Sequence, residues 1–193
     1  MATTNDVKNL IEAMAGSVEA AGRHLGLEAD VKQGTKIELA MFMMYLAASD
    51  GEISWSEASL IGELCDLDLT PQSINSLIQE NNIYSTEFEN KAPLSLRMMI
   101  TLDNNLLAQG IEIKDCTPIV IDTYEAIAKH FMKIDGSIDE SEESDCHIYL
   151  NMLKRYADEN QDRRKRSVHT FSKNTGSVSA PVKSGVTAPR KKG

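Results

Sequence analysis

Apolar residues recur at helical spacing along most of the first 159 residues. In residues 7–25 one helical face is apolar, and Gly26 is expected to end that helix. Residues 37–48 read IELAMFMMYLAA and are apolar nearly all round. A helix of this kind normally lies at the centre of a core, surrounded by other helices.

Local start signals predict where the later helices begin. Thr35 and Glu38 have the spacing of a capping box, in which the first side chain and the fourth cap each other's backbone N–H groups. No alternating apolar–polar run is long enough to build a sheet. The sequence therefore predicts an all-α fold, a compact helical bundle of about seven to eight helices. After the first helix, the expected starts lie at or near Thr35, Ser54, Thr70, Pro93, Thr117 and Asp139.

Charge divides the chain into two parts that need separate explanations. The formal net charge of the whole chain is −9. Residues 160–193 contain nine basic residues and one acidic residue, so they carry +8 and leave −17 on residues 1–159. Residues 160–193 are rich in Ser, Thr, Gly and Pro, and have too little apolar surface to offset their ordering entropy. We predict an all-helical domain over residues 1–159 and a disordered basic tail over residues 160–193.

The most specific pattern is a repeated turn between helices. Residues 47–57 read AASDGEISWSE and residues 132–142 read MKIDGSIDESE, so both contain Asp-Gly-x-Ile-x-x-x-Glu. Each copy follows an apolar segment and precedes a helix with a capping signal. This arrangement predicts an internal pseudo-repeat of two helix–DG turn–helix units.

A structural role accounts for every residue type in this motif. The glycine allows the left-handed conformation that ends a helix, and the isoleucine is expected to enter the core. Ser54 or Asp139 would then cap the next helix, and Glu57 or Glu142 would complete the capping box. On this interpretation the motif needs no ligand.

A cation site is the alternative interpretation of the same carboxylates. The motif matches the second half of an EF-hand loop, but apolar residues or lysine occupy the positions that should supply the first carboxylates in both copies. A complete EF-hand is therefore excluded. If the two turns meet in space, they could still share Ca²⁺ or Mg²⁺, because hard cations prefer clustered oxygen ligands. The candidate metal ligands are Asp50, Glu52, Glu57, Asp135, Asp139 and Glu142.

The segment MMYLAASDGEISWSEASLIGELC, residues 43–65, resembles the signature of the TerB-like (tellurite-resistance protein B) domain family. It is also similar to a domain of some membrane-anchored J-domain co-chaperones. The resemblance covers residues 35–150 in arrangement. It implies a compact, non-enzymatic helical domain associated with bacterial stress, metal-oxyanion resistance and phage or colicin defence. It also implies that divalent cations bind the acidic motif positions, which fall on Asp50, Glu52, Glu57, Asp135 and Glu142.

The remaining reactive residues form no catalytic pattern. The three cysteines lack metal-ligand spacing, and we interpret them as small buried apolar residues. Cys146 and His147 are neighbours on a predicted helix, where successive side chains point in different directions, so they do not face each other as a nucleophile and its base would. We predict no catalytic residue and no enzyme activity. An enzyme that pairs Cys146 or a histidine with a distant residue is the alternative.

Two features indicate contacts with other molecules. Trp55 is expected in the first turn of a helix beside Ile53, where an exposed tryptophan would anchor a protein partner. The RRKR run of the tail could bind nucleic acid, an anionic membrane surface or the acidic domain, or it could only keep the tail solvated. The candidate partner-binding residues are Trp55, Arg163, Arg164, Lys165 and Arg166.

The sequence therefore predicts a binding or scaffold module. The first hypothesis is a module of bacterial stress or defence that responds to Ca²⁺ or Mg²⁺ through clustered carboxylates. The second is a metal-independent protein–protein adaptor, such as an immunity or chaperone-like partner of an operon neighbour. The sequence shows no signal peptide and no transmembrane run, so a cytoplasmic location is predicted.

Overall fold

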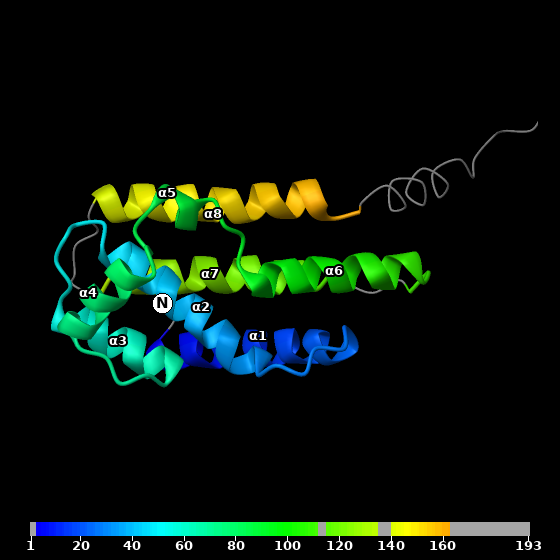
Figure 1. The fold of residues 1–193 in the computed structure, drawn as a ribbon, viewed down its shortest axis with the longest axis horizontal. Coiled ribbons are helices and arrows are strands. Elements are labelled where there is room, and N and C mark those ends of the chain that lie inside the picture. The colour runs from blue at the N-terminus through cyan, green and yellow to red at the C-terminus, as the bar shows by residue number, and fades with distance from the viewer. Residues whose placement is uncertain (1–2, 112–114, 135–139, 163–193) are drawn as a thin grey trace, which may run out of the picture. The chain divides into compact units, whose positions relative to one another are not determined.

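The structure, a computed structural model, describes residues 3–111, 115–134 and 140–162. In these ranges the chain forms eight α-helices and no strand, which confirms the predicted all-α fold class (Figure 1). The chain divides into two units, Met1–Gln161 and Asp162–Gly193, and the first contains all eight helices. The helices are α1 (Thr4–His24), α2 (Val31–Ala47), α3 (Trp55–Cys65), α4 (Pro71–Glu80), α5 (Thr86–Glu89), α6 (Leu94–Ala108), α7 (Thr117–Phe131) and α8 (Glu140–Asn160).

Helix α2 is the centre of the first unit. It packs against α1, α3, α4, α6, α7 and α8. Eleven of its 17 residues are buried, and every residue from Phe42 to Ala47 is among them. The prediction that the helix with apolar residues nearly all round lies at the centre of the core is confirmed.

Long helices surround α2 and present their apolar faces to it. In Figure 1, α1 and α8 lie on opposite sides of α6, and α2 runs obliquely to all three. Aromatic rings fill the space between α2, α7 and α8: the ring centroid of Phe42 lies 5.0 Å from that of Tyr124 and 4.8 Å from that of Tyr149. Across the described ranges, no helix has both the length and the apolar character that a membrane span needs.

The start of α2 differs from the prediction. The prediction that Thr35 and Glu38 form a capping box is wrong, because the helix already begins at Val31. The side chain of Asp30 caps this start and accepts a hydrogen bond from the backbone N–H of Gln33 at 3.0 Å. Thr35 lies inside the helix and donates to the carbonyl of Val31 at 2.9 Å. The Glu38 carboxylate does not cap α2 and instead contacts α6.

Glu38 caps the N-terminus of α6. The residue that precedes α6 is Pro93, whose side chain offers no hydrogen-bond acceptor. The two carboxylate oxygens of Glu38 instead accept hydrogen bonds from the backbone N–H groups of Leu94 and Ser95, the latter at 3.0 Å. The first N–H groups of a helix have no acceptor within the helix and carry partial positive charge, so a carboxylate there is stabilising.

Asp103 of α6 caps α7 in the same way. Its carboxylate is buried and accepts hydrogen bonds from the backbone N–H groups of Cys116 and Thr117, both at 2.9 Å, and from the Thr117 hydroxyl at 2.6 Å. Cys116, the N-cap residue of α7, makes no capping hydrogen bond with its side chain. Carboxylates thus connect α2 to α6 and α6 to α7.

We expect Asp103→Asn to lower the free energy of unfolding by about 2 kcal/mol, because an amide can no longer accept from every donor around it and the buried N–H groups lose a partner. The matched control is Asp122→Asn on the exposed face of α7, which should change that free energy by less than about 0.5 kcal/mol. Urea denaturation measures both. Equal losses in the two variants would contradict the proposed cap.

Candidate functional site

The turn between α2 and α3 has the conformation that the structural interpretation of the repeated motif predicts. Gly51 is left-handed, with φ of 85°. The Asp50 carboxylate accepts a hydrogen bond from the backbone N–H of Glu52 at 2.9 Å. Ser54 and Glu57 form a capping box, in which the Ser54 hydroxyl accepts from the Glu57 N–H at 3.1 Å and the Glu57 carboxylate accepts from the Ser54 N–H at 2.7 Å. Asp50 and Glu57 therefore have local structural partners.

The predicted metal ligands are not gathered into a site by the part of the chain that the structure describes. Asp135 and Asp139 lie outside it. Among the described residues, no group of three or more His, Cys, Asp or Glu side chains could hold a metal ion together. The cation site thus stays a prediction. Of the four members that the structure describes, Asp50 and Glu52 are exposed, whereas Glu57 and Glu142 are buried.

Trp55 lies at the start of α3 with 66% of its surface exposed. The neighbouring Ile53 is half-buried and packs against the core, as the motif predicts. This exposure is compatible with a partner anchor. The other candidate partner-binding residues lie outside the described ranges: Arg163, Arg164, Lys165 and Arg166.

The cysteine thiols are held in their protonated form. Burial raises the pKa of Cys65 to about 12 and that of Cys146 to about 11, and it also raises the pKa of Cys116. The nucleophile in thiol chemistry is the thiolate, so these environments suit structural cysteines. Cys146 is buried while His147 is exposed, as expected for adjacent residues on one helix.

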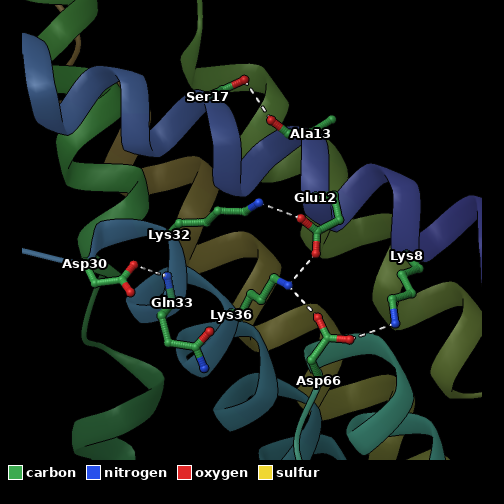
Figure 2. A network of polar contacts seen from close by, with 9 residues as sticks. All are labelled: Lys8, Glu12, Ala13, Ser17, Asp30, Lys32, Gln33, Lys36 and Asp66. Atoms are coloured by element: carbon green, nitrogen blue, oxygen red, sulfur yellow. Dashed lines mark hydrogen bonds and ion pairs between the residues drawn. The ribbon is translucent and has the colours of Figure 1, made fainter.

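A network of ion pairs joins α1, α2 and the end of α3 (Figure 2). The side chain of Lys36 is only 9% exposed and lies between Glu12 and Asp66, with 2.6 Å between its Nζ and the Asp66 Oδ2. Lys8 pairs with Asp66 at 2.8 Å, and Lys32 pairs with Glu12 at 2.9 Å. Each carboxylate therefore contacts two lysines from different positions along the chain.

The electrostatics of this network stabilise its charged form. Hydrogen bonds from Lys36 and then Lys8 lower the pKa of Asp66 to about 2. Hydrogen bonds from Lys36 and then Lys32 lower the pKa of Glu12, and the two carboxylates raise the pKa of Lys36. The carboxylates are already paired with lysines, so we assign the network to holding three helices together.

The network gives a pH-dependent prediction. Asp66→Asn should lower the midpoint of urea unfolding at pH 7, because the amide loses the ion pairs with Lys36 and Lys8 while still suiting the left-handed backbone at this position, where φ is 56°. The pKa of Asp66 is depressed in the folded state, so the wild-type advantage should be complete above about pH 4 and shrink as the pH falls toward 2. A difference that is constant from pH 7 to pH 3 would refute this role.

An open cavity of about 550 Å³ lies between α2, residues 80–93 and α6. We call it the α2–α6 groove. Its apolar lining includes Met41, Phe88, Leu94 and Tyr149. Leu94, in the first turn of α6, is 47% exposed. A concave site of this size with aromatic walls is typical of ligand and peptide binding sites.

Charged side chains border the groove. Its acidic members include Glu80, the last residue of α4, and Glu87 of α5. Its basic members are Lys91, which follows α5, and Arg97 of α6. In Figure 1, α4 and the first turn of α6 lie on opposite sides of the segment that leads through α5. Glu87 and Lys91 lie four residues apart on the segment through α5, so acidic and basic side chains border the groove together.

Other cavities carry less binding chemistry. A cavity of about 710 Å³ beside α7 is larger than the groove, but no Phe, Tyr or Trp side chain lines it, and long charged side chains such as Lys129 and Lys133 form much of its wall. A cavity of about 330 Å³ between α7 and α8 includes the ion pair of Lys154 with Glu125, at 2.6 Å. Of these three cavities, the groove combines an aromatic lining with charged side chains that form no ion pair in the described ranges.

Sequence reasoning missed the groove. It assigned Glu38 to a capping box of its own helix and expected no helix to start between Thr70 and Pro93. The signal in the sequence was the presence of aromatic residues in residues 81–92. One of them, Phe88, has its ring centroid 5.6 Å from those of both Tyr45 and Tyr149.

No family model, characterised protein or solved structure was found to match the chain.

The motif geometry predicts the response to cations. If Asp50 and Glu57 serve only the turn, Ca²⁺ or Mg²⁺ at about 5 mM should shift the melting temperature by less than about 1 °C, and by the same amount in wild type and in Asp50→Asn. Differential scanning fluorimetry measures the shift. A stabilisation of several degrees that disappears in Asp50→Asn would establish the cation site instead.

Proposed function

We propose that this chain is a protein-binding module that holds a segment of a partner protein in the α2–α6 groove, without metal and without catalysis. The observation that carries the proposal is the groove itself. Its lining combines exposed apolar surface at Leu94 with the aromatic side chains of Phe88 and Tyr149, and charged residues surround it. Interfaces for peptide segments have this composition, with apolar anchors at the centre and charges at the rim.

Two further observations support a binding role without metal or catalysis. Asp50 and Glu57 are engaged in the turn and in the capping box. The thiols of Cys65 and Cys146 have raised pKa values, which disfavours a thiolate nucleophile. The alternative is a module that responds to Ca²⁺ or Mg²⁺. The melting experiment with these cations distinguishes it from the metal-independent module.

The cellular setting of the proposal comes from the sequence. The resemblance of residues 43–65 to TerB-like domains supports a role in bacterial stress or defence, and the predicted location is the cytoplasm. An adaptor in such a system would hold one component of a larger assembly. The groove supplies the contact that such an adaptor needs.

A pull-down from native cell extract tests the proposal with a matched pair of variants. Leu94 lines the groove and is 47% exposed, whereas Ile148 on α8 is 46% exposed and does not line it. Leu94→Gln should weaken partner capture about tenfold, because it removes apolar contact surface from the groove, and Ile148→Gln should leave capture unchanged. Both variants should keep the wild-type melting temperature.

The same pull-down distinguishes the two hypotheses about metal. Capture by the wild-type chain should persist in excess EDTA. Release of the partner by EDTA would favour the cation-responsive module. Equal loss of capture in Leu94→Gln and Ile148→Gln, or loss in neither, would contradict a binding site in the groove.

A further inference from the structure

Four of the five tyrosines form one continuous series of aromatic rings that leads from the surface into the core. The series begins at Tyr84, which is 47% exposed, and continues through the buried side chains of Tyr45, Tyr149 and Tyr124. Successive ring centroids lie 5.6, 5.8 and 5.9 Å apart, which is contact distance for aromatic rings. An electron can therefore pass from one ring of the series to the next.

The two outer tyrosines of the series each donate a hydrogen bond to a carboxylate. The hydroxyl of Tyr84 donates to Asp145 Oδ2 at 2.9 Å. The hydroxyl of Tyr45 donates to Glu89 Oε1 at 3.2 Å. The hydroxyl of Tyr124, by contrast, has no hydrogen-bond partner among the residues that the structure describes. A phenol that loses an electron becomes a strong acid, so a stable neutral radical needs a proton acceptor within hydrogen-bond reach.

The surroundings of Tyr45 suit a stored radical. Burial and then the negative charges of Asp145 and Glu89 raise the pKa of Tyr45, so its hydroxyl keeps its proton until the ring is oxidised. The same negative charges stabilise the ring once it has lost an electron. The Tyr45 side chain is fully buried, so a neutral radical there has no charge to desolvate and is shielded from radicals on other molecules.

We propose that Tyr84 and Tyr45 form a one-electron donor site, which reduces a neutral radical oxidant such as nitrogen dioxide and keeps the resulting radical on Tyr45. The oxidant takes an electron from Tyr84 and becomes nitrite, while the phenolic O–H bond breaks and the proton moves to Asp145. An electron from Tyr45 then reduces the Tyr84 radical, and Asp145 returns the proton to the Tyr84 oxygen. The proton of Tyr45 moves to Glu89. In total, Tyr45 gives one electron to the oxidant and one proton to Glu89.

Carboxylates near Tyr84 limit the oxidants that reach its ring. Burial, then the hydrogen bond to Asp145 and the negative charges of Asp145 and Glu89, raise the pKa of Tyr84. Together with the charge of −17 on residues 1–159, these carboxylates repel an anionic oxidant, whereas a neutral one approaches freely. Tyr84 does not line the α2–α6 groove, so this activity goes beyond the proposed function and does not depend on it.

Photogenerated tris(bipyridine)ruthenium(III) tests the donor site, because this complex removes single electrons and takes up no proton. The reference is the full chain with Trp55→Phe, since the indole of Trp55 is 66% exposed and would compete for the oxidant. Freeze-quench electron paramagnetic resonance measures how fast the tyrosyl radical forms and how much of it persists. We expect a persistent radical in the reference chain that forms more slowly in heavy water, because a proton moves with the electron.

Glu89→Gln in this reference chain separates proton transfer from structure. The amide oxygen of glutamine can still accept the hydrogen bond from Tyr45, but it does not take up the proton. The yield of persistent radical should therefore fall at least about tenfold, as it should in Tyr45→Phe. The matched controls are Glu63→Gln, an exposed glutamate on α3, and Tyr156→Phe, a partly buried tyrosine outside the series. Both controls should keep the reference yield.

Tyr84→Phe tests the point at which the electron leaves the protein. Phenylalanine keeps the ring but is not oxidised by the ruthenium complex, so the fast phase of radical formation should be lost. A persistent radical in Tyr45→Phe, or a fast phase that survives in Tyr84→Phe, would overturn the proposal. A full yield in Glu89→Gln, an equal fall in Glu63→Gln, or no persistent radical in the reference chain would overturn it too. None of these results bears on partner capture by the groove.

Discussion

The burial of α2 is the constraint on which the rest of the structure depends. Its last six residues, Phe42 to Ala47, are all buried, so other helices must surround them. Among its charged side chains, Lys36 and Glu38 lie near this core, and a charge near a core must be paired. Lys36 is paired with carboxylates of α1 and of the end of α3, and Glu38 is paired with the N-terminus of α6. These two side chains connect α2 to α1, to the end of α3 and to the start of α6.

The groove follows from this arrangement. Because Glu38 holds the first turn of α6 against α2, residues 81–93 must cross the surface between α4 and α6, and they do so through the single turn of α5. Phe88 anchors that crossing on Tyr45 and Tyr149. Asp103 of α6 in turn caps the N-terminus of α7 with its carboxylate. The candidate site is thus bounded by elements that the core holds in place, which suits recognition by a preformed surface.

The sequence predicted those features whose partners are local. Apolar periodicity gives the helices, and Ser54 with Glu57 forms the capping box that their spacing indicates. The box of Thr35 and Glu38 has equally good spacing, but Asp30 starts α2 earlier and the partner of Glu38 lies 56 residues away in sequence. Sequence spacing carries no information on such distant contacts. The groove was missed for the same reason, because its lining extends from Glu38 to Tyr149 and meets only in the folded chain.

The central claim is that Glu38 of α2 fixes the start of α6 and with it the wall of the groove. Amide hydrogen exchange measured by NMR in Glu38→Gln tests this claim most directly. The account predicts that exchange at Leu94 and Ser95 accelerates about tenfold, because these N–H groups lose a charged acceptor, while amides within α3 keep their wild-type rates. Unchanged exchange at Leu94 and Ser95, or an equal acceleration in α3, would contradict it.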